Sequence, residues 1–167
     1  MHAEGRGSYR GAGHDPLEER RHVFTGFGDY LGATYRDDRV PRDVHTLQQP
    51  YGGLVVEFID AIDGDRDRLH GWLAAEYLPE IVGGPVPVAL CFAPRPLPAD
   101  HLSHVRQLDG VEGLVTVLHF LDVDPRDCWA DRFAASADRF GAAGALAVQA
   151  AFVPTRHGTD AYCDDLF

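Results

Sequence analysis

Residues 54–153 repeat one pattern twice: a strand, a helix and a second strand. Apolar, β-branched runs bounded by Gly, Pro or Asp predict strands over 54–60, 86–93, 113–124 and 145–153. One helical segment follows the first strand and another follows the third. The predicted order is therefore β-α-β-β-α-β, which is two β-α-β halves joined in the middle.

Both helices are predicted from apolar residues that recur every three or four positions. Five residues form the apolar stripe of the first helix: Leu69, Trp72, Leu73, Tyr77 and Ile81. Four residues form that of the second, predicted over 125–140: Trp129, Phe133, Ala137 and Phe140. The Gly-Gly-Pro at 83–85 ends the first helix, and Asp124 caps the second in front of Pro125.

This order predicts the fold class and the domain limits. Two such halves give the ferredoxin-like arrangement, an α+β fold in which an antiparallel four-stranded sheet carries both helices on one face. We assign residues 51–153 to this domain, 1–50 to a partly mobile N-terminal extension and 154–167 to a C-terminal tail. Aromatic residues within 23–50 indicate an irregular strand or a turn. Those in the tail suggest that it docks on the protein as a lid over a pocket.

The third predicted strand is apolar on both of its faces. One face carries Val115, Val117, His119 and Leu121, and the other carries Leu114, Thr116, Leu118 and Phe120. Helices on one side of a sheet leave the other side uncovered, and an apolar face must be buried. The simplest cover is a second copy of the chain, so we predict a homodimer through the sheet face. Periodicity leaves open which face of the strand points to the helices.

Composition excludes several classes of partner. Asp and Glu outnumber Lys and Arg by 26 to 15, so the net charge of -11 would repel a nucleic-acid backbone. The apolar runs are shorter than the ~20 residues that a membrane-spanning helix needs, and no secretory signal is visible. Three widely spaced Cys residues form neither a disulfide framework nor a zinc motif. We expect a cytoplasmic protein with reduced thiols, in a chain whose composition is typical of bacteria.

Two short motifs carry a family resemblance. Residues 72–81 read W-x-x-x-E-Y-L-P-E-I, and the third strand ends in L-D-x-D at 121–124. Together with the flanking strands, they resemble the dimeric α+β barrel superfamily, particularly its EthD-like members, over residues 54–153. The resemblance implies that two ferredoxin-like protomers join sheet to sheet and that each pocket lies between the sheet and its helices. Relatives often have His at the position of Tyr77.

The resemblance implies small-molecule chemistry and leaves the reaction open. The superfamily includes cofactor-independent monooxygenases, polyketide cyclases, haem-degrading enzymes, dehydratases, muconolactone isomerases and small binding proteins. Because one fold hosts all of these, the reaction must be argued from individual side chains.

His119 is the strongest candidate for acid-base chemistry. An imidazole in the middle of an apolar strand must find a hydrogen-bond partner or stay neutral. Tyr77 and His70 border one side of the first helix and are candidate orienting donors. Each of the three also has a structural interpretation, as a packed, hydrogen-bonded or solvated side chain without a catalytic role.

Four further residues are predicted to contact a substrate. Glu57 interrupts an apolar strand, either as a paired carboxylate or as a base in a cavity. Trp72 and Trp129 lie on the helix stripes and Phe92 lies on the second strand, where flat rings would favour an aromatic substrate. The H-x-x-H at 101–104 offers too few ligands for a tight metal site, so no metal is predicted.

These residues lead to two hypotheses. The first is a cofactor-independent lyase, isomerase, cyclase or oxygenase for an aromatic or polyketide-like compound of bacterial secondary metabolism, with His119 as acid and base. The second is a non-catalytic small-molecule or haem-binding protein of the same fold, with His119 or His70 as the haem ligand. An enclosed pocket that contains His119 and another titratable group favours the first. A solid core in which His119 is hydrogen-bonded to backbone would rule out the first.

Overall fold

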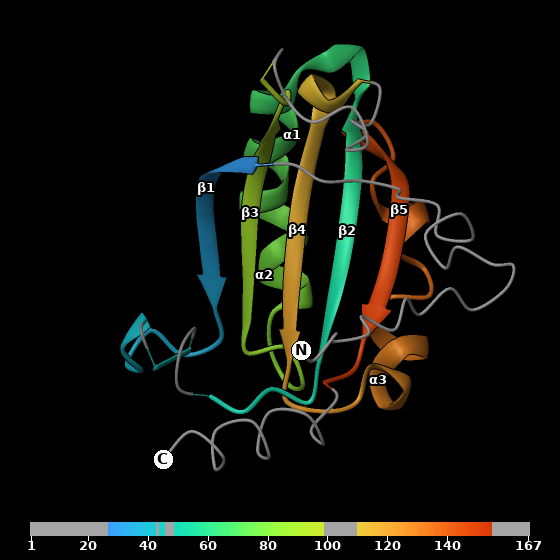
Figure 1. Ribbon diagram of the computed structural model, residues 1–167. Helices are drawn as coiled ribbons and strands as arrows, with labels where there is room; N and C mark the ends of the chain where they lie inside the picture. The colour runs from blue at the N-terminus through green and yellow to red at the C-terminus, as the bar shows by residue number, and fades with distance from the viewer. Residues whose placement is uncertain (1–26, 43, 46–48, 99–109, 155–167) are drawn as a thin grey trace, which may run out of the picture.

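The computed structural model describes residues 27–42, 44–45, 49–98 and 110–154. Within these ranges, five strands form one sheet: β1 (Phe27–Tyr35), β2 (Gly53–Ala61), β3 (Val88–Arg95), β4 (Leu114–Leu121) and β5 (Gly144–Phe152). Their order is β1-β3-β4-β2-β5, and each neighbouring pair is antiparallel (Figure 1). The fold class is therefore α+β, with β4 at the middle of the sheet.

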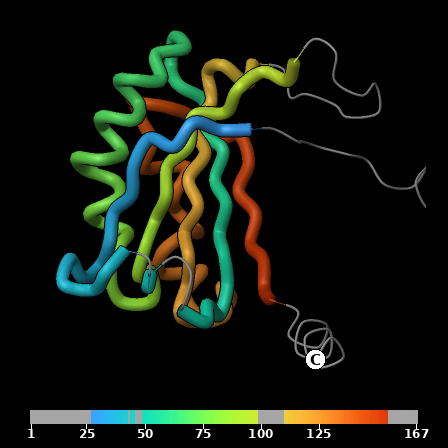
Figure 2. The backbone as a smooth tube through the Cα atoms, turned by 60° about the vertical axis from the view of Figure 1, so that its left-hand side comes forward, coloured from blue at the N-terminus to red at the C-terminus, as the bar shows by residue number. Residues whose placement is uncertain are grey.

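Helices cover one face of this sheet (Figure 1, Figure 2). The first is a continuous rod of α1 (Arg66–Trp72), a π-helical turn (Leu73–Tyr77) and α2 (Leu78–Ile81). The second region contains α3 (Pro125–Arg132) and α4 (Ser136–Arg139). Short 3-10 turns at Ile62–Gly64 and Val111–Gly113 lead into α1 and β4. No helix in the described part of the chain is both long and apolar enough to cross a membrane.

The four strands expected from the sequence are confirmed, each within a few residues of its predicted range. The sheet nevertheless has five strands rather than four, because β1 adds to the free edge of β3. Gly28, Asp29 and Gly32 break the apolar alternation of β1, which is why its sequence indicates only an irregular strand or a turn. Asp29 and Arg95 form an ion pair between the two strands.

The second helical region is interrupted, although the apolar stripe predicts one helix over 125–140. α3 ends at Arg132, and Ala135, with φ −102° and ψ 14°, lies outside helical geometry before α4 begins. Phe133 and Ser136 are buried on either side of this break, whereas Ala134 and Ala135 are exposed. The break therefore presents two buried side chains to the sheet from a short, otherwise exposed segment.

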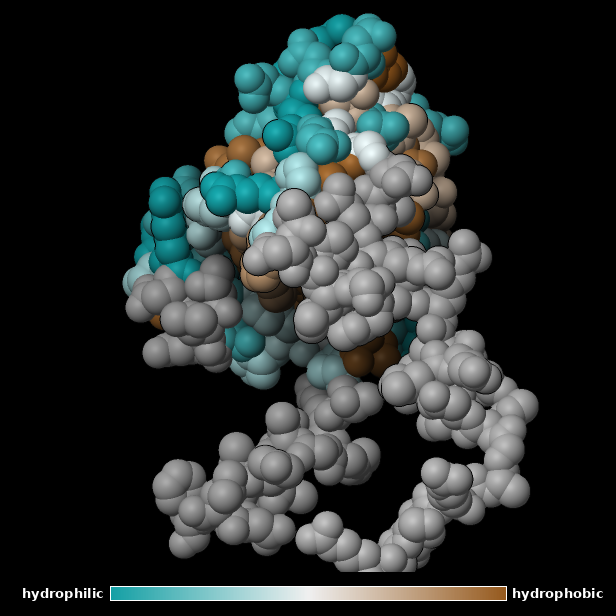
Figure 3. Space-filling view, turned by 45° about the horizontal axis from the view of Figure 1, so that its top comes forward, coloured by the Kyte–Doolittle hydropathy of each residue, from teal (hydrophilic) through white to brown (hydrophobic). Residues whose placement is uncertain are grey.

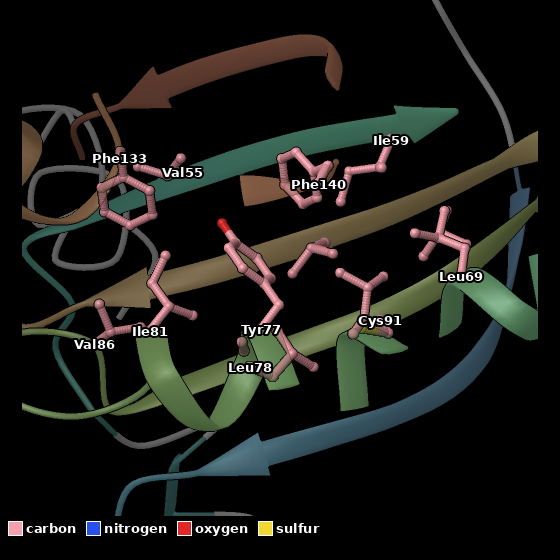
Figure 4. Packing of buried hydrophobic residues seen from close by; sticks show 14 of the residues in the cluster. Val55, Ile59, Leu69, Tyr77, Leu78, Ile81, Val86, Cys91, Phe133 and Phe140 are labelled. Atoms are coloured by element: carbon pink, nitrogen blue, oxygen red, sulfur yellow. The ribbon is translucent and has the colours of Figure 1, made fainter. Parts of the chain in front are cut away.

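The hydrophobic core lies between the sheet and the helices (Figure 4). Side chains alternate along β2, β3 and β4, so that odd-numbered residues turn to the helices and even-numbered ones turn away. The core unites residues from both layers: Val55, Ile59, Cys91, Val115 and Val117 from the strands, and Leu69, Leu73, Ile81, Phe133 and Phe140 from the helical side. His119 belongs to the odd-numbered set and therefore faces the helices.

Within the described part of the chain, the opposite face of the sheet is largely apolar and is not covered by a helix. Tyr30 and Phe152, near its two edges, are 58% and 54% exposed. A hollow of about 380 Å³ on this face is lined by apolar side chains of β1 to β4 and by Thr116. A second, of about 210 Å³, lies beside Tyr51 and Phe120. Figure 3 shows mostly hydrophilic residues, in teal, at the upper end of the molecule. Several hydrophobic residues, in brown and tan, are visible below them.

Substitution of two glycines by Ala is expected to change the free energy of unfolding in opposite directions. A Cβ on Gly52 would lie 2.6 to 2.8 Å from backbone atoms of Val123, whereas a Cβ on Gly71 in α1 would meet nothing within 4 Å. We expect Gly52→Ala to lower the free energy of unfolding by roughly 1–3 kcal/mol through overpacking. Gly71→Ala should raise it by about 1 kcal/mol, because Ala favours a helix. Urea denaturation measures both, and a Gly52→Ala protein as stable as its parent would contradict the close approach.

Candidate functional site

A buried polar cluster lies on the helix-facing side of the sheet. Glu57 on β2 and His119 on β4 are completely buried, and Tyr77 reaches them from the end of the π-helical turn. Val55 pairs with His119 and Glu57 with Val117, so the two polar residues are diagonal neighbours on adjacent central strands. The structure thus brings together three residues that the sequence singles out separately.

The carboxylate of Glu57 accepts hydrogen bonds from three side chains. The Tyr77 hydroxyl donates to Oε2 at 2.8 Å, and Nε2 of His119 lies 2.8 Å from the same oxygen. Nε2 of Gln149 donates to Oε1 at 2.7 Å. Both oxygens of the buried carboxylate therefore have partners, which is the condition for a charge to be tolerated in a core.

The hydrogen bond to Glu57 fixes the tautomer of His119. Because an ionised carboxylate only accepts, Nε2 of His119 carries the proton of a neutral ring. Nδ1 then bears a lone pair, and this atom is buried without a hydrogen-bond partner. The core therefore contains a basic nitrogen whose ring is oriented by a carboxylate and whose own lone pair is unused.

The surroundings favour an ionised Glu57 and a neutral Tyr77. Burial acts to raise the pKa of Glu57, but it is outweighed by the hydrogen bond of His119, by the charge of that ring whenever it is protonated, and by the hydrogen bonds of Tyr77 and Gln149, so the pKa lies below its usual value. Burial, and then the charge of Glu57, raise the pKa of the Tyr77 phenol well above its usual range. The cluster therefore has one fixed negative charge and one fixed phenol donor.

Two members of the cluster were missed by the sequence prediction. Gln149 on β5 pairs directly with Glu57, and Ser136 opens α4. Ser136 Oγ accepts from Nε2 of Gln149 at 2.9 Å and donates to the carbonyl of Phe133 at 2.6 Å. The signal for Gln149 was an amide inside the apolar run ALAVQAAFV. Its partner was hidden because a bulge shifts the pairing between Phe58 and Ile59.

Aromatic rings enclose the cluster. The Phe133 ring lies 5.3 Å from the His119 ring, and Phe140 lies 5.0 Å from Tyr77. Trp72 stacks on Tyr77 at 6.0 Å, within 17° of parallel. Trp129 and Phe133 are 5.8 Å apart. The two tryptophans predicted to contact a substrate are therefore one ring removed from the polar atoms.

The π-helical turn positions Tyr77. The backbone N–H of Leu78 bonds to the carbonyl of Leu73, five residues back, so this turn contains one more residue than an α-helical turn. Pro79 follows directly and cannot donate a backbone hydrogen bond. Leu73 and Tyr77, at its two ends, are both buried, and π-turns of this kind are frequent at functional sites.

Two predicted site residues lie apart from this cluster. His70 is on α1, where its Nε2 would be 3.9 Å from a Cβ on Gly32 of β1, and the hydrogen bonds of Glu57 do not include it. Phe92 is on the open face of the sheet, with its ring 5.8 Å from that of Tyr30. Trp72 and Phe92 therefore lie on opposite sides of the sheet and do not form the walls of one pocket.

Other chemistry predicted or considered from the sequence is placed as follows. Burial raises the pKa of the Cys91 thiol to about 12, so this residue is an unreactive core side chain. Among the described residues, no group of three or more His, Cys, Asp or Glu side chains is arranged to hold a metal ion. The H-x-x-H at 101–104 and nearly all of the predicted tail lid lie outside the described residues.

Comparison with known proteins adds no assignment. No protein-family model, curated protein or solved structure matches this chain. The resemblance to the dimeric α+β barrel superfamily therefore stays a prediction based on the motifs at 72–81 and 121–124.

Glu57 predicts a loss of stability in acid. Because its folded pKa lies below the usual 4.5, the unfolded state binds the proton more tightly. The stabilising contribution is thus complete above about pH 4.5 and is lost as the pH falls through the lower folded pKa. Glu57→Gln should lower the free energy of unfolding at neutral pH and flatten its decline in acid. Urea denaturation at a series of pH values measures both effects.

Asp37→Asn is the matched control. The Asp37 carboxylate is partly exposed and its partner Arg39 is fully exposed, and hydrogen bonds from Arg39 lower the pKa of Asp37 to about 2. Salt screens an exposed pair of this kind much more than a buried one, so only the Asp37 contribution should fade in about 1 M NaCl. An acid profile of Glu57→Gln that runs parallel to that of the parent would contradict an ionised Glu57 in the core.

Proposed function

We propose that the protein is a cofactor-independent enzyme of bacterial small-molecule metabolism, in which His119 transfers a proton of an aromatic or polyketide-like substrate. The observation that carries this proposal is the unpartnered Nδ1 of His119 on a ring held by Glu57. A carboxylate that orients an imidazole and stabilises its protonated form is a recurrent device of general-base catalysis. The proposed setting is the cytoplasm.

The proton transfer balances without a further reactant. Nδ1 removes a proton from a C–H or O–H group, and the bonding electrons stay on the substrate as an enolate or phenolate. Glu57, 2.8 Å from Nε2, stabilises the imidazolium. Return of the proton to a different atom of the enolate yields an isomer. In a cyclisation the enolate carbon attacks a carbonyl carbon of the same substrate, and the alkoxide that forms takes the proton. In an elimination the enolate electrons form a double bond as the leaving group departs with its bonding pair, and the leaving group takes the proton. The oxygenase version would in addition require dioxygen to react with the enolate.

A purely structural role explains the cluster less well. Well-packed apolar side chains in place of a buried ion-pair network are often neutral or stabilising, so stability alone gives little reason to keep such a cluster. His119 also bonds to a titratable side chain rather than to backbone. An unsatisfied buried nitrogen has a cost of its own, which a ligand would relieve.

Solvent-deuterium exchange tests the proposed base directly. Enolisable aromatic ketones, 2-tetralone among them, are incubated with the protein in deuterated buffer and followed by proton NMR. We expect catalysed exchange that falls roughly 100-fold or more in His119→Gln, because the base is lost. Tyr77→Phe should lose less, since Tyr77 acts through Glu57.

Glu76→Gln is the control for this assay. Glu76 is an exposed carboxylate next to Tyr77 in the sequence, and its substitution should leave the exchange rate unchanged. Circular dichroism establishes that each variant is folded. Equal exchange by the parent and His119→Gln with every ketone would refute the proposal, and unchanged exchange in Tyr77→Phe would reduce Tyr77 to a packing residue.

We further propose that the domain is ferredoxin-like and pairs sheet to sheet as a dimeric α+β barrel. The order β3-β4-β2-β5 supports this, because it interleaves the two β-α-β halves. Five strands of eight or nine residues make a face about 24 Å by 30 Å, or roughly 700 Å². This area approaches the ~800 Å² that each partner buries in a standard interface. The proposed occupant of the open face is therefore a second copy.

Leu118→Arg tests the dimer. Leu118 is on the open face of β4 and lines the larger hollow, so a charge there should be buried and unpaired in the interface. We expect a dimer for the parent and a folded monomer for Leu118→Arg in analytical ultracentrifugation. Ala75→Arg, an equally drastic change at an exposed helix position, should stay dimeric.

A non-catalytic binding protein is the second candidate. The observation in its favour is the apolar hollow of about 380 Å³ on the open face, which offers space for a small apolar ligand. A parent protein that is monomeric at micromolar concentration would contradict the proposed dimer and would leave this hollow accessible to such a ligand. A Soret band on addition of haemin would point to its haem-binding form.

A further inference from the structure

The Glu57 network lacks one hydrogen-bond donor. Both carboxylate oxygens already accept hydrogen bonds, from Tyr77, His119 and Gln149. The remaining polar atom is Nδ1 of His119, which is buried and has no partner. A lone pair in the interior is satisfied by an incoming O–H or N–H and not by another acceptor. The ligand that completes this cluster on a neutral His119 ring is therefore a donor.

The charges around the cluster restrict this donor further. Glu57 provides a negative charge from β2, and the Tyr77 phenol beside it stays protonated. Arg139 on α4 is engaged with Glu80, with 3.5 Å between Nη1 and Oε1. Proton transfer from a neutral ligand to His119 leaves the total charge unchanged, because an imidazolium then lies between two anions. A ligand that arrives as an anion would add a second negative charge to the buried site.

The aromatic rings define the shape of the ligand. The rings of Phe133 and His119 meet at 65° with 5.3 Å between their centres. Phe133 lies in the break between α3 and α4 and is followed by the exposed Ala134 and Ala135. Displacement of this segment would open the site, and it would break the hydrogen bonds that the Phe133 carbonyl accepts from Ser136 and from Gln149 of β5. A flat ring is the natural replacement for the Phe133 side chain, with the half-buried Trp129 alongside.

We infer that the site binds an uncharged aromatic O–H donor, such as a phenol or an enolised aryl ketone. Its hydroxyl donates to Nδ1 of His119, and its ring takes the place of the Phe133 ring. The inference rests on the proposed function, because it names the ligand class on which His119 acts. Beyond the proposed function, this inference excludes the corresponding anions as ligands and places the ligand ring at the position of the Phe133 side chain.

Three probes of similar shape separate the contributions of shape, donor and charge: p-cresol, toluene and 4-methylbenzoate. Protein labelled with ¹⁵N in its histidine rings is titrated with each, and His119→Gln identifies the signals of His119. We expect p-cresol to bind at least about fivefold more tightly than toluene, from one added hydrogen bond. It should shift the resonance of Nδ1 more than that of Nε2. 4-Methylbenzoate should not bind.

Phe133→Ala and the milder Phe133→Leu test the same site without the Phe133 ring in it. They keep the experiment decisive if this ring leaves the site too rarely in the parent protein for binding to be measured. Removal of the ring should raise the affinity for both p-cresol and toluene, and p-cresol should still bind more tightly than toluene. Equal binding of these two, preference for 4-methylbenzoate, or no binding to the parent or either variant overturns the ligand class. The ring nitrogen signals of His119 in the ligand-free protein test the proposed function separately from the ligand class. A proton on Nδ1 rather than on Nε2 would overturn the proposed function. A proton on Nε2 would support it.

Discussion

The contact between Glu57 and His119 is the interaction on which the rest of the interior depends. A carboxylate placed between a sheet and its helices costs several kcal/mol unless it is paired and hydrogen-bonded. The partners of Glu57 come from β4, from the π-helical turn and from β5, and Ser136 adds α4 through Gln149. The elements of both layers must therefore meet at one carboxylate, which makes this cluster a strong constraint on how the helices lie over the sheet.

Three local irregularities of the described chain lie around the Glu57 cluster. The π-turn ends at Tyr77, the bulge between Phe58 and Ile59 adjoins the pairing of Glu57 with Gln149, and the helix break brings in Phe133 and Ser136. Bulges and π-turns are less stable than regular structure, and they persist where they direct a side chain. Three of them around one buried pair are better explained by a functional site than by packing alone.

These irregularities also mark the limit of prediction from the sequence. The strands and the stripe of the first helix were predictable, because apolar residues recur in the sequence at every second position in a strand and at every third or fourth position in a helix. Glu57, Tyr77 and His119 could be chosen as chemically unusual, but their meeting depends on strand register, which one sequence does not encode locally. Gln149 was hidden by a bulge. Phe92 and Trp72, both predicted to contact a substrate, lie on opposite sides of the sheet, because periodicity does not say which face of a strand the helices cover.

Alternation along β4 separates the two proposed roles of the sheet. His119 points to the helices and Leu118, one residue earlier, points to the open face. The proposed chemistry and the proposed assembly therefore use interleaved positions of the same strand, and a change at an even-numbered position would alter assembly without touching the Glu57 network. The two proposed roles are nevertheless linked, because a shift of one residue in the register of β4 would turn His119 to the open face and Leu118 to the helices. The pairing of β4 between β2 and β3 on both sides resists such a slip, so the central strand keeps both roles in register.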